Sequence, residues 1–234
     1  MTTNDILGLV ASYVYAIGLI ALAEVLRRTI KLPQDLTRKL VHVGAGMWVF
    51  GTLALFDHWQ WGVLPFATFI VGNYLFYRYR VFSSMDSANG TPGTVYFALA
   101  ITVLFGLLWR PQGPIDRAPV AVAGTMALTW GDALAALVGQ RYGWHRYRFG
   151  RSTRSWEGSI TLFIAAAIAI LLTLVWLPGS ALSPLSVAPG NALALAAALV
   201  AALAAALAEA VSPHGTDNLS VPFVATLAVW LIAR

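Results

Sequence analysis

Long apolar stretches separated by short polar connections account for most of the chain. A membrane-crossing helix needs about 20 predominantly apolar residues. Eight stretches approach that length, at residues 6–26, 40–56, 61–77, 93–109, 118–138, 159–177, 191–211 and 219–233. We therefore predict an all-α fold: a polytopic integral membrane helix bundle of about eight transmembrane helices, forming a single domain over residues 1–234.

The composition supports a membrane protein. Hydrophobic residues make up 59% of the chain and charged residues 11%, and the mean hydropathy is +0.72. Soluble domains carry about 25% charged residues, so a soluble fold is excluded, and disorder is excluded because it requires low hydrophobicity. The chain has no cysteine, which rules out disulfide scaffolds, thiolate nucleophiles and cysteine-ligated metals.

The basic residues predict an orientation in the membrane. Three alternate connections, within residues 27–39, 78–80 and 141–154, hold 12 of the 15 lysines and arginines. The opposite side has only Arg110, Arg117 and Arg234. By the positive-inside rule the basic side is cytoplasmic, so we expect both termini outside. The net charge of +5 then reflects topology, and no nucleic-acid partner is expected.

Three acidic residues fall inside or at the ends of apolar stretches. Ionisable residues in membrane helices are costly and are candidates for function. Glu24 precedes Arg27 and Arg28 by three and four residues, which favours an ordinary ion pair. Asp132 lies about 20 Å from the outer end of its helix at 1.5 Å per residue, and like Glu209 it has no local basic partner. A structural hydrogen bond between helices is the alternative for both.

A basic cluster opens the second predicted helix. Arg38 and His42 are four residues apart and share a face, and Lys39 points about 100° away on a helix of 3.6 residues per turn. Taken alone, the cluster is equally consistent with side chains that snorkel to the interface and set topology.

Two further cytoplasmic connections carry polar groups suited to phosphate and metal. Residues 139–158 combine glycines, hydroxyls, arginines and Glu157, and Asp217 and Asn218 begin the last helix, where an N-cap is the alternative. Carboxylates among arginine and glycine fit a Mg²⁺–phosphate site. The chain contains no P-loop motif. The residues that converge on this side are Arg38, Lys39, His42, Asp132, Glu157, Glu209 and Asp217.

Four motifs in order resemble the polyprenol kinase family, which includes dolichol kinase, phytol kinase and CTP-dependent diacylglycerol kinase. They are Arg38-Lys39-x-x-His42, Gly131-Asp132-Ala133 with Gly139 and Tyr142-Gly143, Arg154-Ser155-Trp156-Glu157-Gly158-Ser159, and Glu209 followed by Asp217-Asn218-Leu219-x-Val221-Pro222. The match runs from about residue 38 to 222, and the third motif looks most like the phytol kinase branch. Arg154 stands where many relatives have lysine, and only arginine binds phosphate in a bidentate manner.

The resemblance implies transfer of the γ-phosphoryl group of CTP, or another nucleoside triphosphate, to an isoprenoid alcohol such as phytol, geranylgeraniol or a polyprenol. For this reaction we expect Mg²⁺ on Asp132 and Asp217, with Glu209 or Glu157 as further ligands. Asp132 or His42 would accept the hydroxyl proton. The residues expected to bind the nucleotide are Arg38, Lys39, Arg154, Ser155, Gly158 and Asn218.

Two other functions fit parts of the pattern. The block from Asp132 to Gly158 is also similar to CDP-diacylglycerol synthases (phosphatidate cytidylyltransferases), although Arg38-Lys39-x-x-His42 favours a kinase. A small transporter would use the acids as an ion relay, but residues 1–117 and 118–234 show no repeat. We expect an integral protein of a bacterial plasma membrane, with lipid and nucleotide partners and a cytoplasm-facing site; an oligomer is left open.

Overall fold

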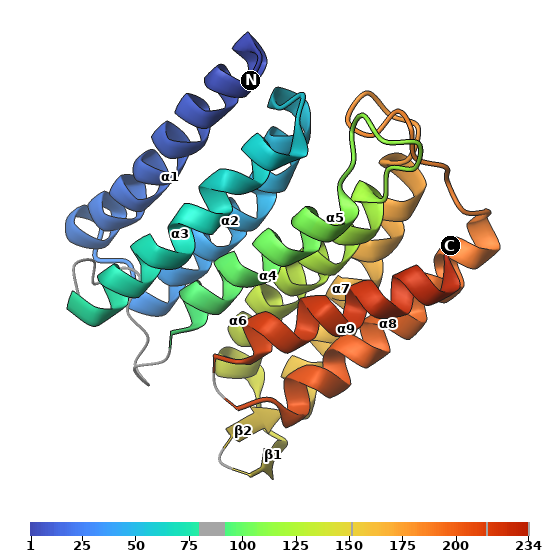
Figure 1. Ribbon diagram of the computed structural model, residues 1–234. Helices are drawn as coiled ribbons and strands as arrows, with labels where there is room; N and C mark the ends of the chain where they lie inside the picture. Colours follow the sequence, from blue (N-terminus) through green and yellow to red (C-terminus); the bar gives the residue numbers. More distant parts are fainter. Residues whose placement is uncertain (80–91, 151, 214, 234) are drawn as a thin grey trace.

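The computed structural model describes residues 1–79, 92–150, 152–213 and 215–233, and this part of the chain is predominantly helical (Figure 1). All eight predicted stretches coincide with helical segments. Arg80, Arg151 and Arg234, which we assigned to one or the other side of the membrane, lie outside the described residues.

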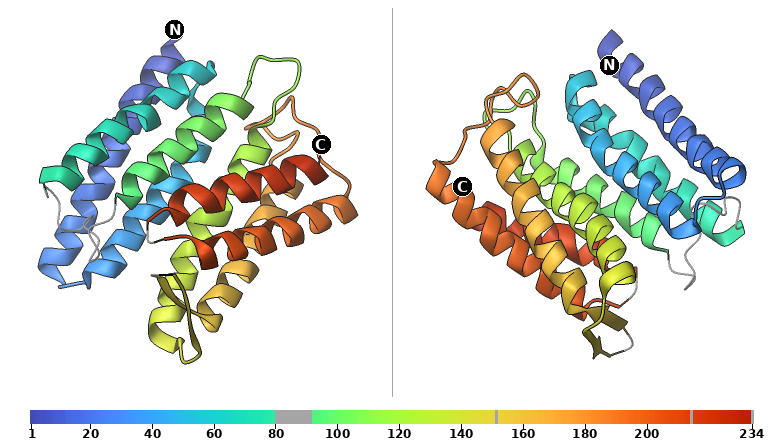
Figure 2. Two further views of the ribbon diagram at one scale, coloured as in Figure 1. Left: turned by 60° about the horizontal axis from the view of Figure 1, so that its bottom comes forward. Right: turned by 180° about the vertical axis from the view of Figure 1, so that it is seen from behind.

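The first half of the chain supplies four helices. They are α1 (Thr3–Thr29), α2 (Gln34–Leu55), α3 (Trp59–Tyr79) and α4 (Gly93–Leu108). Helix α1 begins with a capping box, in which the Thr2 side chain accepts from the Asp5 amide and the Asp5 carboxylate accepts from the Thr2 amide. Helix α1 packs on α2 and α3, and α3 packs on α4, which places α4 between the two halves (Figures 1 and 2).

The fifth predicted helix is continuous but changes its winding. It consists of α5 (Ala118–Met126), a π-helical stretch η1 (Ala127–Asp132) and α6 (Ala133–Tyr142). Single π-helical turns inside α-helices are frequent at functional sites. Here the π-helical turn ends at Asp132, the acid already singled out as a candidate.

A short hairpin follows that the helical pattern did not predict. Strands β1 (Arg146–Phe149) and β2 (Ser152–Ser155) pair antiparallel, with Arg146 opposite Ser155. Three helices complete the described chain: α7 (Trp156–Trp176), α8 (Asn191–Val211) and α9 (Asp217–Ile232). The hairpin lies at the opposite end of the molecule from the N-terminus (Figures 1 and 2).

Close packing around η1 depends on small residues. One face of the alanine-rich helix α8 is fully buried, at Ala194, Ala197, Ala198, Ala201, Ala202 and Ala205, which confirms that this run serves helix packing. Gly46 of α2 faces Thr129 of η1 so closely that a Cβ at Gly46 would lie 2.1 Å from Thr129 Oγ1. The lack of a side chain at Gly46 therefore sets the separation of α2 and η1.

Four helical segments in the described residues are long and apolar enough to cross a membrane, judged by length and composition: Thr3–Thr29, Ala118–Tyr142, Trp156–Trp176 and Asn191–Val211. Helices α4 and α9 are apolar but shorter. The fold thus agrees with a helical membrane protein. The number of about eight spans and the outside location of the termini stay predictions.

We expect Gly46→Ala to destabilise the protein, because the new methyl group would force α2 away from η1. Overpacking of this kind costs about 1–3 kcal/mol. Thermal unfolding in detergent measures the effect. Gly18→Ala is the matched control, since a Cβ there meets nothing within 4 Å, and equal stability of the two variants would contradict the close contact.

Candidate functional site

A cavity of about 550 Å³ lies between the first four helices and the second half of the chain. One end is lined by charged side chains from α2, η1, β1, β2, α8 and α9, and the other by apolar and aromatic side chains from α1 to α4. Its size is within the range of small-molecule sites, about 300–1,000 Å³. The cavity joins a polar and an apolar chamber.

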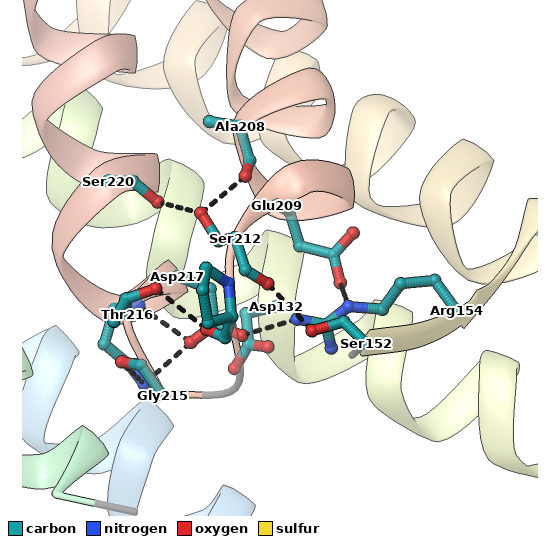
Figure 3. A network of polar contacts seen from close by, with 12 residues as sticks. Asp132, Ser152, Arg154, Ala208, Glu209, Ser212, Gly215, Thr216, Asp217 and Ser220 are labelled. Atoms are coloured by element: carbon teal, nitrogen blue, oxygen red, sulfur yellow. Dashed lines mark hydrogen bonds and ion pairs between the residues drawn. The ribbon is translucent and has the colours of Figure 1, made fainter. Parts of the chain in front are cut away.

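Arg154 is the centre of the polar end. Its Nε lies 2.9 Å from Oε1 of Glu209, and its Nη2 donates to Oδ2 of Asp217 at 2.9 Å (Figure 3). All three side chains are largely buried. Burial would lower the pKa of Arg154, but the two carboxylates outweigh it and raise that pKa above its ordinary value. Arg154 therefore stays charged while holding two helices together.

The hairpin brings Arg154 to this position and is anchored at both ends of β2. The Ser152 hydroxyl donates to the carbonyl of Ser212, between α8 and α9, at 3.1 Å. The Ser155 hydroxyl caps α7 by accepting from the amide of Gly158 at 3.1 Å. The predicted nucleotide-binding residues Ser155 and Gly158 thus hold the loop and also line the cavity.

A second ion pair closes the opposite wall of the polar end. Lys39 Nζ donates to Oδ2 of Asp132 at 2.5 Å and to its carbonyl oxygen at 3.3 Å. Nε2 of His42 lies 3.7 Å from the same carboxylate oxygen. Figure 3 shows Asp132 beside the Arg154 group, so the structure brings Lys39, His42, Asp132, Arg154, Glu209 and Asp217 into one site.

The remaining predicted residues differ in position. Arg38 lines the cavity with its guanidinium 3.5 Å from Oδ1 of Asp35. Asn218 lines it too, and its side-chain amide donates to Asp217 Oδ1 at 3.3 Å. Glu157 is hydrogen-bonded to His145, whose Nδ1 lies 2.7 Å from Oε1 of Glu157. Glu157 does not line the cavity.

Glu24 lies outside the site, as predicted. Its carboxylate accepts from Arg28 Nε at 2.8 Å, which confirms the expected pair along one helix. The residue does not line the cavity.

The oxygen atoms at the polar end suit Mg²⁺. Oε2 of Glu209 is buried and has no hydrogen-bond partner among the described residues. The described residues contain no group of three or more histidine or acidic side chains set to hold a metal, and two of the carboxylates pair with Lys39 and Arg154. Mg²⁺ in phosphate sites uses one or two carboxylates and completes its shell with phosphate oxygens and water, so the donor set fits.

Asp35 and Asn73 line the cavity but were not predicted from the sequence, and Gln140, Arg146 and Thr153 were included only as part of the connection 139–158. Asn73 could have been predicted as a cavity residue, because it is a lone amide in an apolar stretch. Its side-chain amide donates to the carbonyl of Thr94 at 3.0 Å. Arg146 and Thr153 reach the cavity through the hairpin, for which the sequence analysis had no signal.

Comparison with known proteins identifies relatives over nearly the whole chain. A phytol kinase of Synechocystis sp. is 34% identical over 230 residues, which cover 95% of this chain and 89% of the relative. A probable chloroplastic phytol kinase of Glycine max is 27% identical, over 86% of this chain and 66% of the relative. One of Zea mays is 26% identical, over 86% and 68%. No protein-family model and no solved structure matches the chain.

We expect Arg154→Met to lower the free energy of unfolding by about 3 kcal/mol, because it leaves Glu209 and Asp217 buried without a cation. Chemical unfolding in detergent measures the loss. Adding Glu209→Gln to Arg154→Met should recover part of it, whereas Arg148→Met, at an exposed hairpin position, serves as the control. A variant as stable as the wild type would show that the two ion pairs do not hold this end together.

Proposed function

The chain belongs to the phytol kinase family of alcohol kinases, and from this premise we propose that it phosphorylates an isoprenoid alcohol such as phytol, geranylgeraniol or a polyprenol. The donor is a nucleoside triphosphate, with CTP expected from the resemblance. One observation carries the proposal: a single cavity joins buried cations and carboxylates to an apolar chamber. Such a cavity suits a charged donor and a hydrophobic acceptor that meet at one point.

The cations at the polar end bind the triphosphate in this proposal. Arg38 is partly exposed beside Asp35 and meets the nucleotide at the cavity mouth. Lys39 and Arg154 lie deeper and reach the β- and γ-phosphates. Ser155 and Gly158 shape the adjacent backbone, and the amide of Asn218 adds a neutral donor. Phosphate binding would draw Lys39 and Arg154 partly away from their carboxylates, which would free those oxygens.

The freed carboxylates would then be available to hold Mg²⁺. We assign Asp132 and Asp217 as ligands and Glu209, with its unpartnered oxygen, as a further one. When bound, the ion neutralises charge on the phosphate oxygens during transfer. Glu157 is left out of this proposal because its carboxylate is engaged by His145 outside the cavity.

The chemical step is an in-line displacement. The alcohol oxygen forms a bond to the γ-phosphorus while the bond from that phosphorus to the β,γ-bridging oxygen breaks, and the nucleoside diphosphate leaves. The hydroxyl proton passes to Asp132 or His42, whose side chains lie together. Positioning and charge stabilisation supply most of the catalysis in such reactions. We place the site at the cytoplasmic face of a bacterial plasma membrane, on the side of the basic connections.

The test uses purified protein in detergent with Mg²⁺ and γ-³²P-labelled CTP. Phytol, geranylgeraniol, a longer polyprenol and diacylglycerol are the acceptors. We expect label in an isoprenoid alcohol, and competition by unlabelled ATP, GTP and UTP ranks the donors. If label reached phosphatidate from α-labelled CTP, and no alcohol was labelled from γ-labelled CTP, the protein would be a cytidylyltransferase and not a kinase.

We predict that Asp132→Asn and Asp217→Asn each abolish turnover, because an amide is a poorer ligand for Mg²⁺ and a poorer base. Initial rates with labelled nucleotide measure this, and thermal unfolding shows whether the variants fold. Glu24→Gln, outside the cavity, should stay active. Near wild-type activity in a folded Asp132→Asn or Asp217→Asn variant would remove that residue from the metal site.

We predict that Arg38→Ala raises the KM for the nucleotide about tenfold, the equivalent of one charge-assisted hydrogen bond. The KM for the alcohol should change little, because the guanidinium lies at the polar mouth of the cavity. Saturation curves for each substrate separate the two effects. An unchanged nucleotide KM would place the triphosphate elsewhere.

A further inference from the structure

We propose that the apolar end of the cavity binds the hydrocarbon chain of the acceptor alcohol and that Trp48 closes this chamber, so that Trp48 limits the length of chain accepted. The inference rests on the proposed function and adds to it a binding chamber and a residue that determines specificity.

The apolar chamber is formed by four helices and has no charged side chain in its wall. Its lining comes from α1, α2, α3 and α4, and the principal contributors are Tyr15, Leu19, Ala45, Phe66, Phe69 and Phe97. The Tyr15 hydroxyl is satisfied within the protein, because it donates to the carbonyl of Gly44 at 2.9 Å. The chamber therefore offers apolar and aromatic surface, and it suits an isoprenoid chain better than a polar substrate.

The order of residues along α2 gives the chamber its direction. Lys39, His42, Ala45 and Trp48 all line the cavity. Because three residues fall short of a full turn, these positions wind around α2, from Lys39 against Asp132 of η1 to Trp48 against Ser12 of α1. The lining thus changes from charged to aromatic over about 14 Å at 1.5 Å per residue. A hydroxyl placed beside Asp132 and His42 would leave its hydrocarbon chain running toward Trp48.

Trp48 forms the far end of this chamber. It is the last cavity-lining residue of α2 toward the Leu55 end, and Ser12 of α1 and Pro65 of α3 occupy the corresponding last positions of their helices. The indole Nε1 donates to Ser12 Oγ at 3.0 Å. The ring stacks on Tyr15 with centroids 4.3 Å apart, so two contacts hold the ring across the end of the chamber.

Small residues lie behind the indole ring. A Cβ at Gly51 would approach the ring of Trp48 to 2.9 Å, and Ser12 donates to the carbonyl of Gly8 at 2.7 Å. On the Gly8 side lies Phe56, whose ring would be 2.7 Å from a Cβ at Gly8. Removing the indole would therefore extend the chamber toward Gly51 and Gly8.

The experiment compares kcat/KM for geraniol, farnesol, geranylgeraniol and a longer polyprenol in wild type and variants. Trp48→Ala should raise the ratio of the longest to the shortest acceptor by about tenfold or more, the scale on which apolar pockets discriminate added methylenes. Trp48→Phe keeps a ring at the end and should shift the ratio less. Trp176→Ala removes an indole that is 70% exposed on α7 and should leave the ratio unchanged.

A second variant tests the same chamber if Trp48→Ala does not fold. Ala45 lines the cavity midway between His42 and Trp48, so Ala45→Phe should abolish activity on the longer acceptors and spare the shortest. A folded Trp48→Ala, or failing that Ala45→Phe, with the wild-type length profile would overturn the inference. A wild-type enzyme that phosphorylates none of these alcohols would instead overturn the proposed function.

Discussion

The pairing of one buried guanidinium with two buried carboxylates underlies the polar end of this molecule. Arg154 comes from a hairpin, Glu209 from the end of α8 and Asp217 from the start of α9. Removing charges from water is costly unless they are paired. The buried guanidinium and the two buried carboxylates each need the others as partners, and this need holds the three segments together. A hydrogen bond from Ser152 to the α8–α9 connection supports the same arrangement.

The pairing of buried charges stabilises the fold and also gathers the polar groups of the candidate site. Neutralising buried acids with arginine and lysine lets three carboxylates lie close together at the polar end of the cavity. The same cations are suited to phosphate, so in the proposed mechanism one group of side chains serves two states. In one state cations and carboxylates pair with each other, and in the other cations meet phosphate while carboxylates meet Mg²⁺. The π-helical turn η1 ends at Asp132 and brings that carboxylate to Lys39.

The cavity also resolves a problem of solubility. A nucleoside triphosphate belongs in water and an isoprenoid alcohol belongs in lipid, yet their reacting atoms must meet. Helix α2 contributes to both environments, because Lys39 and His42 line the cavity near the start of the helix and Trp48 lines it about two turns beyond His42. The alanine-rich face of α8 and the glycine contact between α2 and η1 permit the close packing that keeps this cavity defined.

The apolar pattern of the chain was enough to predict the helical class and the positions of the apolar helices, and its isolated charges indicated most of the residues that meet at the polar end of the cavity. The length of an apolar stretch and an isolated acid within it, such as Asp132 or Glu209, can be recognised without knowing which residues they contact. The pairs Lys39–Asp132 and Arg154–Glu209 become visible only in the folded chain, because their members are far apart in the sequence. The tertiary structure also separated Glu157 from the other acids through His145. The apolar chamber was equally hidden, because Tyr15, Trp48 and Phe66 look like any other aromatic residues in apolar helices until packing brings them to one cavity.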